Sequence, residues 1–111
     1  MKEIKAFLKP GRAKLVVDAL KEGGFDCITL SKAEGTGSFK SPDAFPSLDF
    51  KITDSPIVKL ELVCNDDNVN QIIDIISSNG RTTERGDGLI YVSKVETAYR
   101  IKSGEQISSF Y

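Results

Sequence analysis

"MKEIKAFLKPGRAKLVVDALKEGG", residues 1–24, changes its hydrophobic period once, and this change decides the fold. In the first part, Ile4, Ala6 and Leu8 recur at every second position, which predicts a β-strand with one buried face. The proline and glycine that follow interrupt the strand, and the spacing then becomes helical. The expected helical stripe carries Leu15, Val16, Ala19 and Leu20. Two consecutive glycines supply a C-terminal stop after about three turns.

The rest of the chain repeats this order of strand and helix. Further strands are predicted at residues 25–35, 57–64 and 88–101, and a second helix at residues 65–80. Polar residues at 65–67 suit the start of that helix, and an Asn-Gly pair suits its end. Residues 37–56 contain three prolines and four serines and show no sustained period, so we expect a long loop there.

The order strand, helix, strand, loop, strand, helix, strand predicts an α+β fold, a ferredoxin-like βαββαβ sandwich formed by one domain, residues 1–111. Two helices would cover one face of the antiparallel sheet. On the other face we expect Phe7, Ile57, Val63 and Tyr91, which alternate out of phase with the core residues. An apolar face of this kind predicts oligomerisation.

Composition excludes several classes of function. Fifteen basic against sixteen acidic residues give a net charge of -1, so nucleic acid is not an expected partner. The absence of histidine removes the usual general base and the usual transition-metal ligand. No apolar run is long enough for membrane insertion, and we expect a cytoplasmic protein. Cys27 and Cys64 lie in apolar segments without CxxC spacing and are expected to be buried, reduced thiols, with no metal.

The "GDG" of Gly86, Asp87 and Gly88 allows two interpretations. An Asp-Gly pair is a common hairpin turn. Glycine-rich turns also expose backbone N–H groups that bind anions, and Arg100 and Lys102, expected on one face of an extended segment, could supply charge for a phosphate. A second glycine pair in "EGTG", residues 34–37, would let a ligand approach the backbone closely.

Together these motifs resemble the P-II family of nitrogen-regulatory signal proteins over about 90 residues. The opening strand and helix, up to "EGTG", and the segment "GDGLIYVSKVETAYRIKSGE" carry the resemblance. It implies a homotrimer that binds adenine nucleotides between subunits, and a T-loop, residues 37–56, that regulates a partner protein. Positions implied to bind nucleotide are Thr29, Gly35 and Gly37 on the adenine and ribose side, Gly86, Asp87 and Gly88 in the phosphate-side loop 81–88, and Arg100 and Lys102 from the adjoining subunit's C-terminal tail, residues 100–111.

Departures from the family pattern qualify this expectation. Leu89 stands where the family has a lysine after GDG, so one phosphate-neutralising charge is missing and AMP or ADP should be favoured, with ATP still a possible ligand. Lys102 replaces an arginine, which keeps the charge but loses the bidentate fork. Phe39 and Ile57 replace residues that hold 2-oxoglutarate in the family, so sensing of that metabolite should be lost. The loop has no tyrosine to accept a nucleotidyl group.

We therefore expect a non-enzymatic signalling protein that regulates an enzyme or a transporter, with a membrane transporter as one candidate partner and recruiter to the membrane. Phe39, Phe45 and Phe50 are candidate anchors for that partner, although local packing would explain them equally well. One alternative is a small ferredoxin-like enzyme with Asp87 as acid or base and Arg100 as an anion clamp. Another is a degenerate relative that binds no nucleotide.

Overall fold

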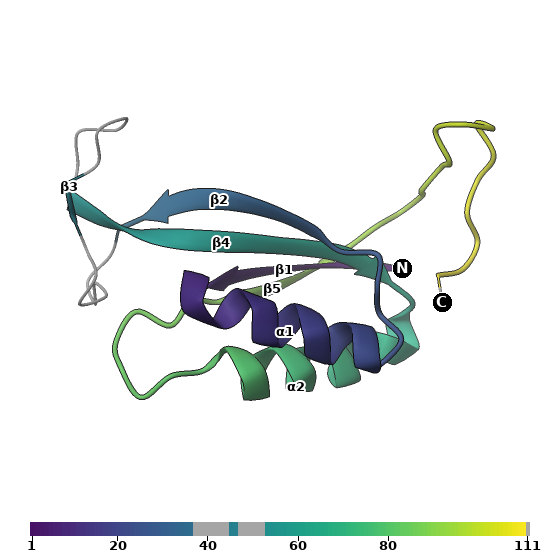
Figure 1. Cartoon of the computed structure of the whole chain (residues 1–111). Helices are drawn as coiled ribbons and strands as arrows, with labels where there is room; N and C mark the ends of the chain where they lie inside the picture. Colours follow the sequence, from purple (N-terminus) through teal and green to yellow (C-terminus); the bar gives the residue numbers. More distant parts are fainter. Residues whose placement is uncertain (37–44, 47–52, 111) are drawn as a thin grey trace.

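The computed structural model describes residues 1–36, 45–46 and 53–110 (Figure 1). The elements in chain order are β1 (Lys2–Leu8), α1 (Pro10–Glu22), β2 (Thr29–Gly35), β3 (Phe45–Pro46), β4 (Thr53–Cys64), the 3-10 turn η1 (Asp66–Asn68), α2 (Val69–Gly80) and β5 (Ile90–Lys94). The strands pair in the order β2-β4-β1-β5, and every pairing is antiparallel; β3 pairs with the start of β4. This topology confirms the predicted ferredoxin-like sandwich.

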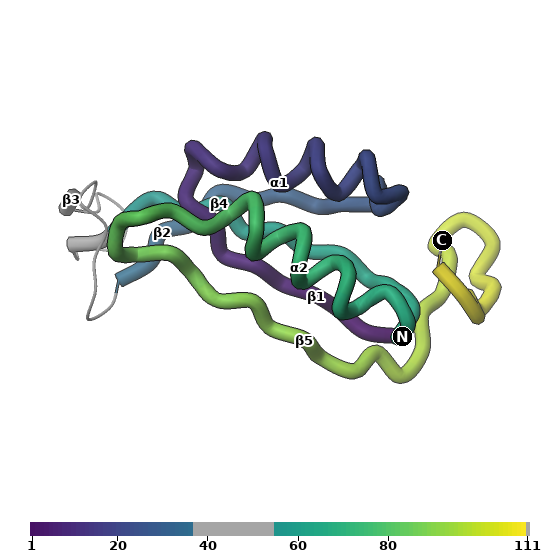
Figure 2. The backbone as a smooth tube through the Cα atoms, turned by 90° about the horizontal axis from the view of Figure 1, so that it is seen from below, coloured from purple at the N-terminus to yellow at the C-terminus, as the bar shows by residue number. Residues whose placement is uncertain are grey.

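Both helices lie side by side on the same face of the sheet, as Figures 1 and 2 show from two directions. The register places Ile4 opposite Leu62 and Ala6 opposite Leu60, so the inward residues of β1 and β4 form one continuous apolar surface. Val16 and Leu20 of α1 pack on it and are fully buried. Ile72 and Ile76 of α2 complete this single core.

Helix α1 departs from the predicted pattern at two points. Pro10 is its first residue, because proline has no N–H to donate and its fixed φ suits the first turn. The stripe predicted from Leu15 is displaced: Leu15 is 47 % exposed, whereas Val17 packs against the core. Because a helix turns by about 100° per residue, Leu15 and Val17 lie on opposite flanks of Val16, and only the flank with Val17 packs against the core.

Strand β4 begins at Thr53, four residues before the predicted start, so part of the expected loop 37–56 is strand. This early start of β4 results from strand pairing and not from a period in the sequence. Strand β2 continues to Gly35 and holds Ser55 and Pro56 in register. Pro56 is tolerated because β1 has already ended opposite Val58, so β4 has only one long neighbour at that point.

The structure also corrects three other predictions: the extent of the last strand, the capping role of Asn65 and the burial of Cys27. Strand β5 ends at Lys94, and residues 101–103 form a turn, so Arg100 and Lys102 do not lie on one extended segment as predicted. Asn65 precedes η1 but makes no side-chain cap, because its amide is bonded to Phe110 instead. Cys64 is buried as expected, but Cys27 is exposed in the connection before β2, where Phe25 takes the buried position.

The sheet face away from the helices carries the predicted apolar residues. Phe7 and Tyr91 lie on adjacent strands and meet edge to face, with ring centroids 5.5 Å apart. Ile57 and Val63 lie on the same face of β4, on either side of the ion-paired residues Lys59 and Glu61, whose Nζ and Oε1 are 3.2 Å apart. In one chain Tyr91 is still 50 % exposed, so this open face has apolar area left for a partner.

Candidate functional site

The GDG segment lies in the loop between α2 and β5 and packs tightly on the end of β1. Gly86 has φ +90°, a conformation that favours glycine. A Cβ atom at Gly88 would overlap the backbone carbonyl of Phe7, so only glycine lets the loop approach β1 this closely. The Phe7 N–H donates to the Leu89 carbonyl at 3.1 Å and extends the ladder towards the loop. These glycines are therefore required by backbone geometry.

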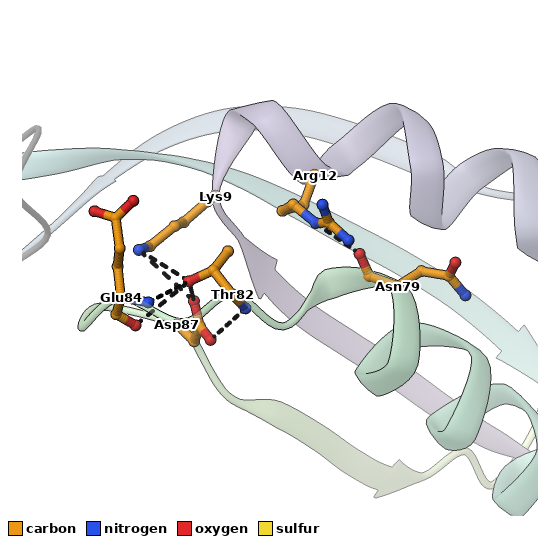
Figure 3. Close-up of polar contacts among 6 residues, drawn as sticks. All are labelled: Lys9, Arg12, Asn79, Thr82, Glu84 and Asp87. Atoms are coloured by element: carbon orange, nitrogen blue, oxygen red, sulfur yellow. Dashed lines mark hydrogen bonds and ion pairs between the residues drawn. The ribbon is translucent and has the colours of Figure 1, made fainter.

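Asp87 is held within the loop by Thr82 (Figure 3). The Thr82 N–H donates to Oδ2 at 2.8 Å, and the Thr82 hydroxyl donates to Oδ1 at 2.7 Å. The same hydroxyl oxygen accepts from the Glu84 N–H at 3.2 Å and from Lys9 Nζ at 3.3 Å. Thr82 thus uses its donor and both acceptor positions and joins the loop to β1's end.

Lys9 is the cation of the cluster that it forms with Thr82 and Asp87. Its side chain is only 14 % exposed, and its Nζ lies 3.7 Å from Asp87 Oδ1. Partial burial works to raise the pKa of Asp87, but the two Thr82 hydrogen bonds and the Lys9 charge outweigh it and lower that pKa. Asp87 is therefore a bound carboxylate near neutral pH. This makes it poorly suited to the general acid or base role of the enzyme alternative.

A cleft of about 150 Å³ opens beside the loop and is bordered by Lys9, Arg81, Asp87 and Gly88. Arg81 is partly engaged, because its guanidinium donates to the Ser77 carbonyl at 3.1 Å and to the Ser77 hydroxyl at 3.0 Å. Leu89, at the position where a lysine was expected, is 62 % exposed and adds no charge. The cleft's positive charge comes from Arg81 and from Lys9, and the sequence did not single out Lys9.

The predicted nucleotide-binding residues fall into two groups. Gly35 ends β2 and Gly86, Asp87 and Gly88 precede β5; in Figure 1 both segments lie at the end of the sheet near β3. The C-terminal segment with Arg100 and Lys102 lies at the opposite end in both views, and β5 separates it from the GDG loop. Thr29 belongs with that second group, since it lines a hollow together with Phe110. One chain does not bring the two groups together.

Some predicted residues lie outside the described part of the chain: Gly37, Phe39 and Phe50. Phe45 is described only by its backbone, in β3. Lys9 and Thr82 were missed because nothing local marks them: they are 73 residues apart in sequence and meet only after β1 and α2 pack together. Among the described residues, no group of three or more cysteine, aspartate or glutamate side chains could hold a metal ion.

Known proteins provide an independent comparison. The family model described as "Nitrogen regulatory protein P-II" matches residues 1–105. The chain belongs to the P-II family. It is 39 % identical over 106 residues to the nitrogen regulatory protein P-II of Bradyrhizobium diazoefficiens, covering 95 % of both chains, and 37 % identical over the same length to that of Rhizobium meliloti. An archaeal relative, nitrogen regulatory protein P-II 2 of Methanothermobacter thermautotrophicus, is 32 % identical over 95 % of this chain and 92 % of its own.

Membership confirms the resemblance inferred from the GDG segment and the opening strand and helix. P-II proteins are regulators that act on partner proteins, and this chain has their fold and nearly their full length. No helix in the described part of this P-II chain is long and apolar enough to cross a membrane.

Proposed function

We propose that this P-II chain forms a homotrimer, binds an adenine nucleotide in clefts between subunits, and regulates a partner protein through its T-loop, residues 37–56. AMP or ADP is the favoured ligand and ATP a weaker one. The proposal includes a non-enzymatic role, a cytoplasmic location and a partner that is an enzyme or a transporter, with recruitment to the membrane if the partner is a membrane transporter.

The observation that carries the proposal is the division of the candidate ligands between two ends of the sheet. The glycine-rich GDG loop, a candidate source of backbone N–H groups, lies at one end, and the exposed cations Arg100 and Lys102 lie at the other. A polyanion needs both kinds of group. Two neighbouring copies can supply them to one cleft if one copy's GDG loop faces the other's C-terminal segment.

The open sheet face supports the assembly. Phe7, Tyr91, Ile57 and Val63 would be covered there by the same face of other copies, which a closed ring permits. The charged pair Lys59 and Glu61 on this face is already neutralised within the chain, which lowers the cost of covering it.

Preference among nucleotides follows from the charge of the cleft. Lys9 is neutralised by Asp87, and Arg81 is bonded to Ser77, so the GDG side offers little free positive charge. Each added phosphate brings further negative charge that this side cannot match. We expect calorimetric titration to give tighter binding of ADP or AMP than of ATP, with and without magnesium. A parent protein that binds none of the three would refute nucleotide binding.

A complementation experiment tests whether the site is shared. Arg100→Ala removes a cation from one half, and Gly88→Ala forces the loop away from Phe7 in the other. Each variant alone should lose most ADP binding, Arg100→Ala by roughly 1.5–3 kcal/mol. After the two are unfolded together and refolded as mixed oligomers, about one quarter of the sites should combine two intact halves and bind again. Absence of any recovery would contradict a shared site.

A further inference from the structure

Residues 98–107 form a narrow turn that carries Arg100 and Lys102. The Ile107 N–H donates to the Ala98 carbonyl at 2.8 Å, and the Arg100 N–H donates to the Glu105 carbonyl at 2.9 Å. Gly104, with φ +72°, closes the turn. The chain therefore doubles back, and the residues after 107 return towards the body of the molecule (Figure 2).

The returning segment is fixed by one side chain. The Asn65 amide donates to the Phe110 carbonyl, and the Asn65 carbonyl oxygen accepts from the Phe110 N–H at 2.7 Å. Asn65 directly follows β4, so its backbone is held by the sheet and the turn η1. Two hydrogen bonds to one residue define the position of Phe110 and close residues 98–110 into a loop anchored at both ends.

Phe110 forms part of the wall of a hollow of about 260 Å³ on the open face of the sheet. Thr29 and Val63 contribute a hydroxyl and apolar surface, and Glu3 and Glu61 contribute carboxylates. This volume is below the range of about 300–1,000 Å³ typical of pockets that enclose a whole drug-sized ligand. It suits one flat ring system rather than a complete nucleotide.

We propose that Phe110 is the stacking wall for the planar base of the bound nucleotide, and that Asn65 is the residue that positions it. This inference rests on the proposed function, because it assigns one end of the same ligand. An aromatic ring offers a stacking surface, and carboxylate and hydroxyl oxygens accept hydrogen bonds from the N–H groups of a base. The carboxylates would repel a phosphate, so the phosphates lie outside the hollow, towards cations such as Arg100.

Binding of ADP to Phe110 variants, measured by calorimetry, tests the stacking role. Phe110→Ala should weaken binding by roughly ten-fold, and Phe110→Tyr, which keeps the ring, should restore parental affinity. Phe110→Leu should restore only part of it, because leucine fills space without a π-face. Equal affinity of parent and Phe110→Ala would overturn the proposal, as would full rescue by leucine. A parent that binds no nucleotide would instead refute the proposed function from which this inference starts.

Positioning by Asn65 has a separate readout. In the parent, ADP should shift the ring-proton NMR signals of Phe110 through the ring current of the base, while those of Phe25, 3 % exposed in the core, serve as an internal reference. Asn65→Ala should weaken ADP binding and abolish the shift, whereas Asn68→Ala, three residues along in η1, should do neither. Unchanged Phe110 shifts in Asn65→Ala would show that Asn65 is not needed to position Phe110.

Discussion

The cluster of Lys9, Thr82 and Asp87 should stabilise the fold, and Asp87→Ala tests this directly. The substitution removes the acceptor of two short hydrogen bonds from Thr82 and the counter-ion of Lys9, whose side chain is 14 % exposed. Hydrogen bonds to a charged group contribute roughly 1.5–3 kcal/mol each. Because the Asp87 side chain is 34 % exposed, solvent reduces this contribution, and we expect a total loss of about 2 kcal/mol.

Urea unfolding at a fixed protein concentration measures this loss, since oligomers unfold in a concentration-dependent way. A loss of that size corresponds to a fall in Tm of roughly 8 °C for a domain of this length. Asp18→Ala is the matched control: Asp18 Oδ2 lies 2.7 Å from Lys14 Nζ, a shorter ion pair than that of Lys9, but both side chains are at least half exposed. We expect no measurable destabilisation there.

The pH dependence has a defined sign. The pKa of Asp87 is lower in the folded state than in the unfolded state, so its stabilisation is present above the unfolded value of about 3.9. It is lost as pH falls through the folded pKa. The difference in unfolding free energy between parent and Asp87→Ala should be constant around neutral pH and shrink below about pH 4. A difference equal to that of Asp18→Ala, or one that grows on acidification, would refute the reasoning.

Three further predictions concern the core, the glycines and the open sheet face. Leu20→Ala should lower the unfolding free energy by about 2–5 kcal/mol because Leu20 is fully buried, whereas Leu15→Ala should change it little; equal losses in urea unfolding would contradict the packing. Gly11→Ala, with no atom within 4 Å of the added Cβ, should stabilise α1 by roughly 0.5–1 kcal/mol, whereas Gly88→Ala should destabilise, and thermal melts of both variants check this contrast. Tyr91→Glu should dissociate the proposed trimer, and light scattering that shows no change in mass would mean that this face is not the interface.

Several features of this protein follow from local sequence alone. Residues 1–8 alternate and residues 12–22 have a helical spacing, so the strand and helix were predictable from period and from the stop at Gly23 and Gly24. The order of these elements predicted the topology, and the GDG segment predicted the family. Such predictions succeed because period and glycine placement act within a few residues.

Other features were set only by contacts between distant residues. Thr53–Pro56 show no strand period but are strand because β2 pairs with Ser55 and Pro56, and β3 pairs with the two residues before them. Leu15 satisfies the helical stripe as well as Val17 does, and only the packing of α1 on the rest of the fold decides which of them is covered. Arg100 and Lys102 have the spacing of residues on one face of a strand. They do not lie on a strand, because the chain forms a turn there that Gly104 closes.

The candidate sites show the same division. Sequence alone placed glycines at the end of one strand and just before another, and two cations, Arg100 and Lys102, near the end of the chain. It could not determine that Lys9 lies beside Asp87, or that Asn65 holds Phe110 over Thr29, because these contacts span 78 and 45 residues. No local period encodes such contacts; they arise when the strands and helices bury their apolar faces together, and only the tertiary structure decides which polar side chains this brings into reach.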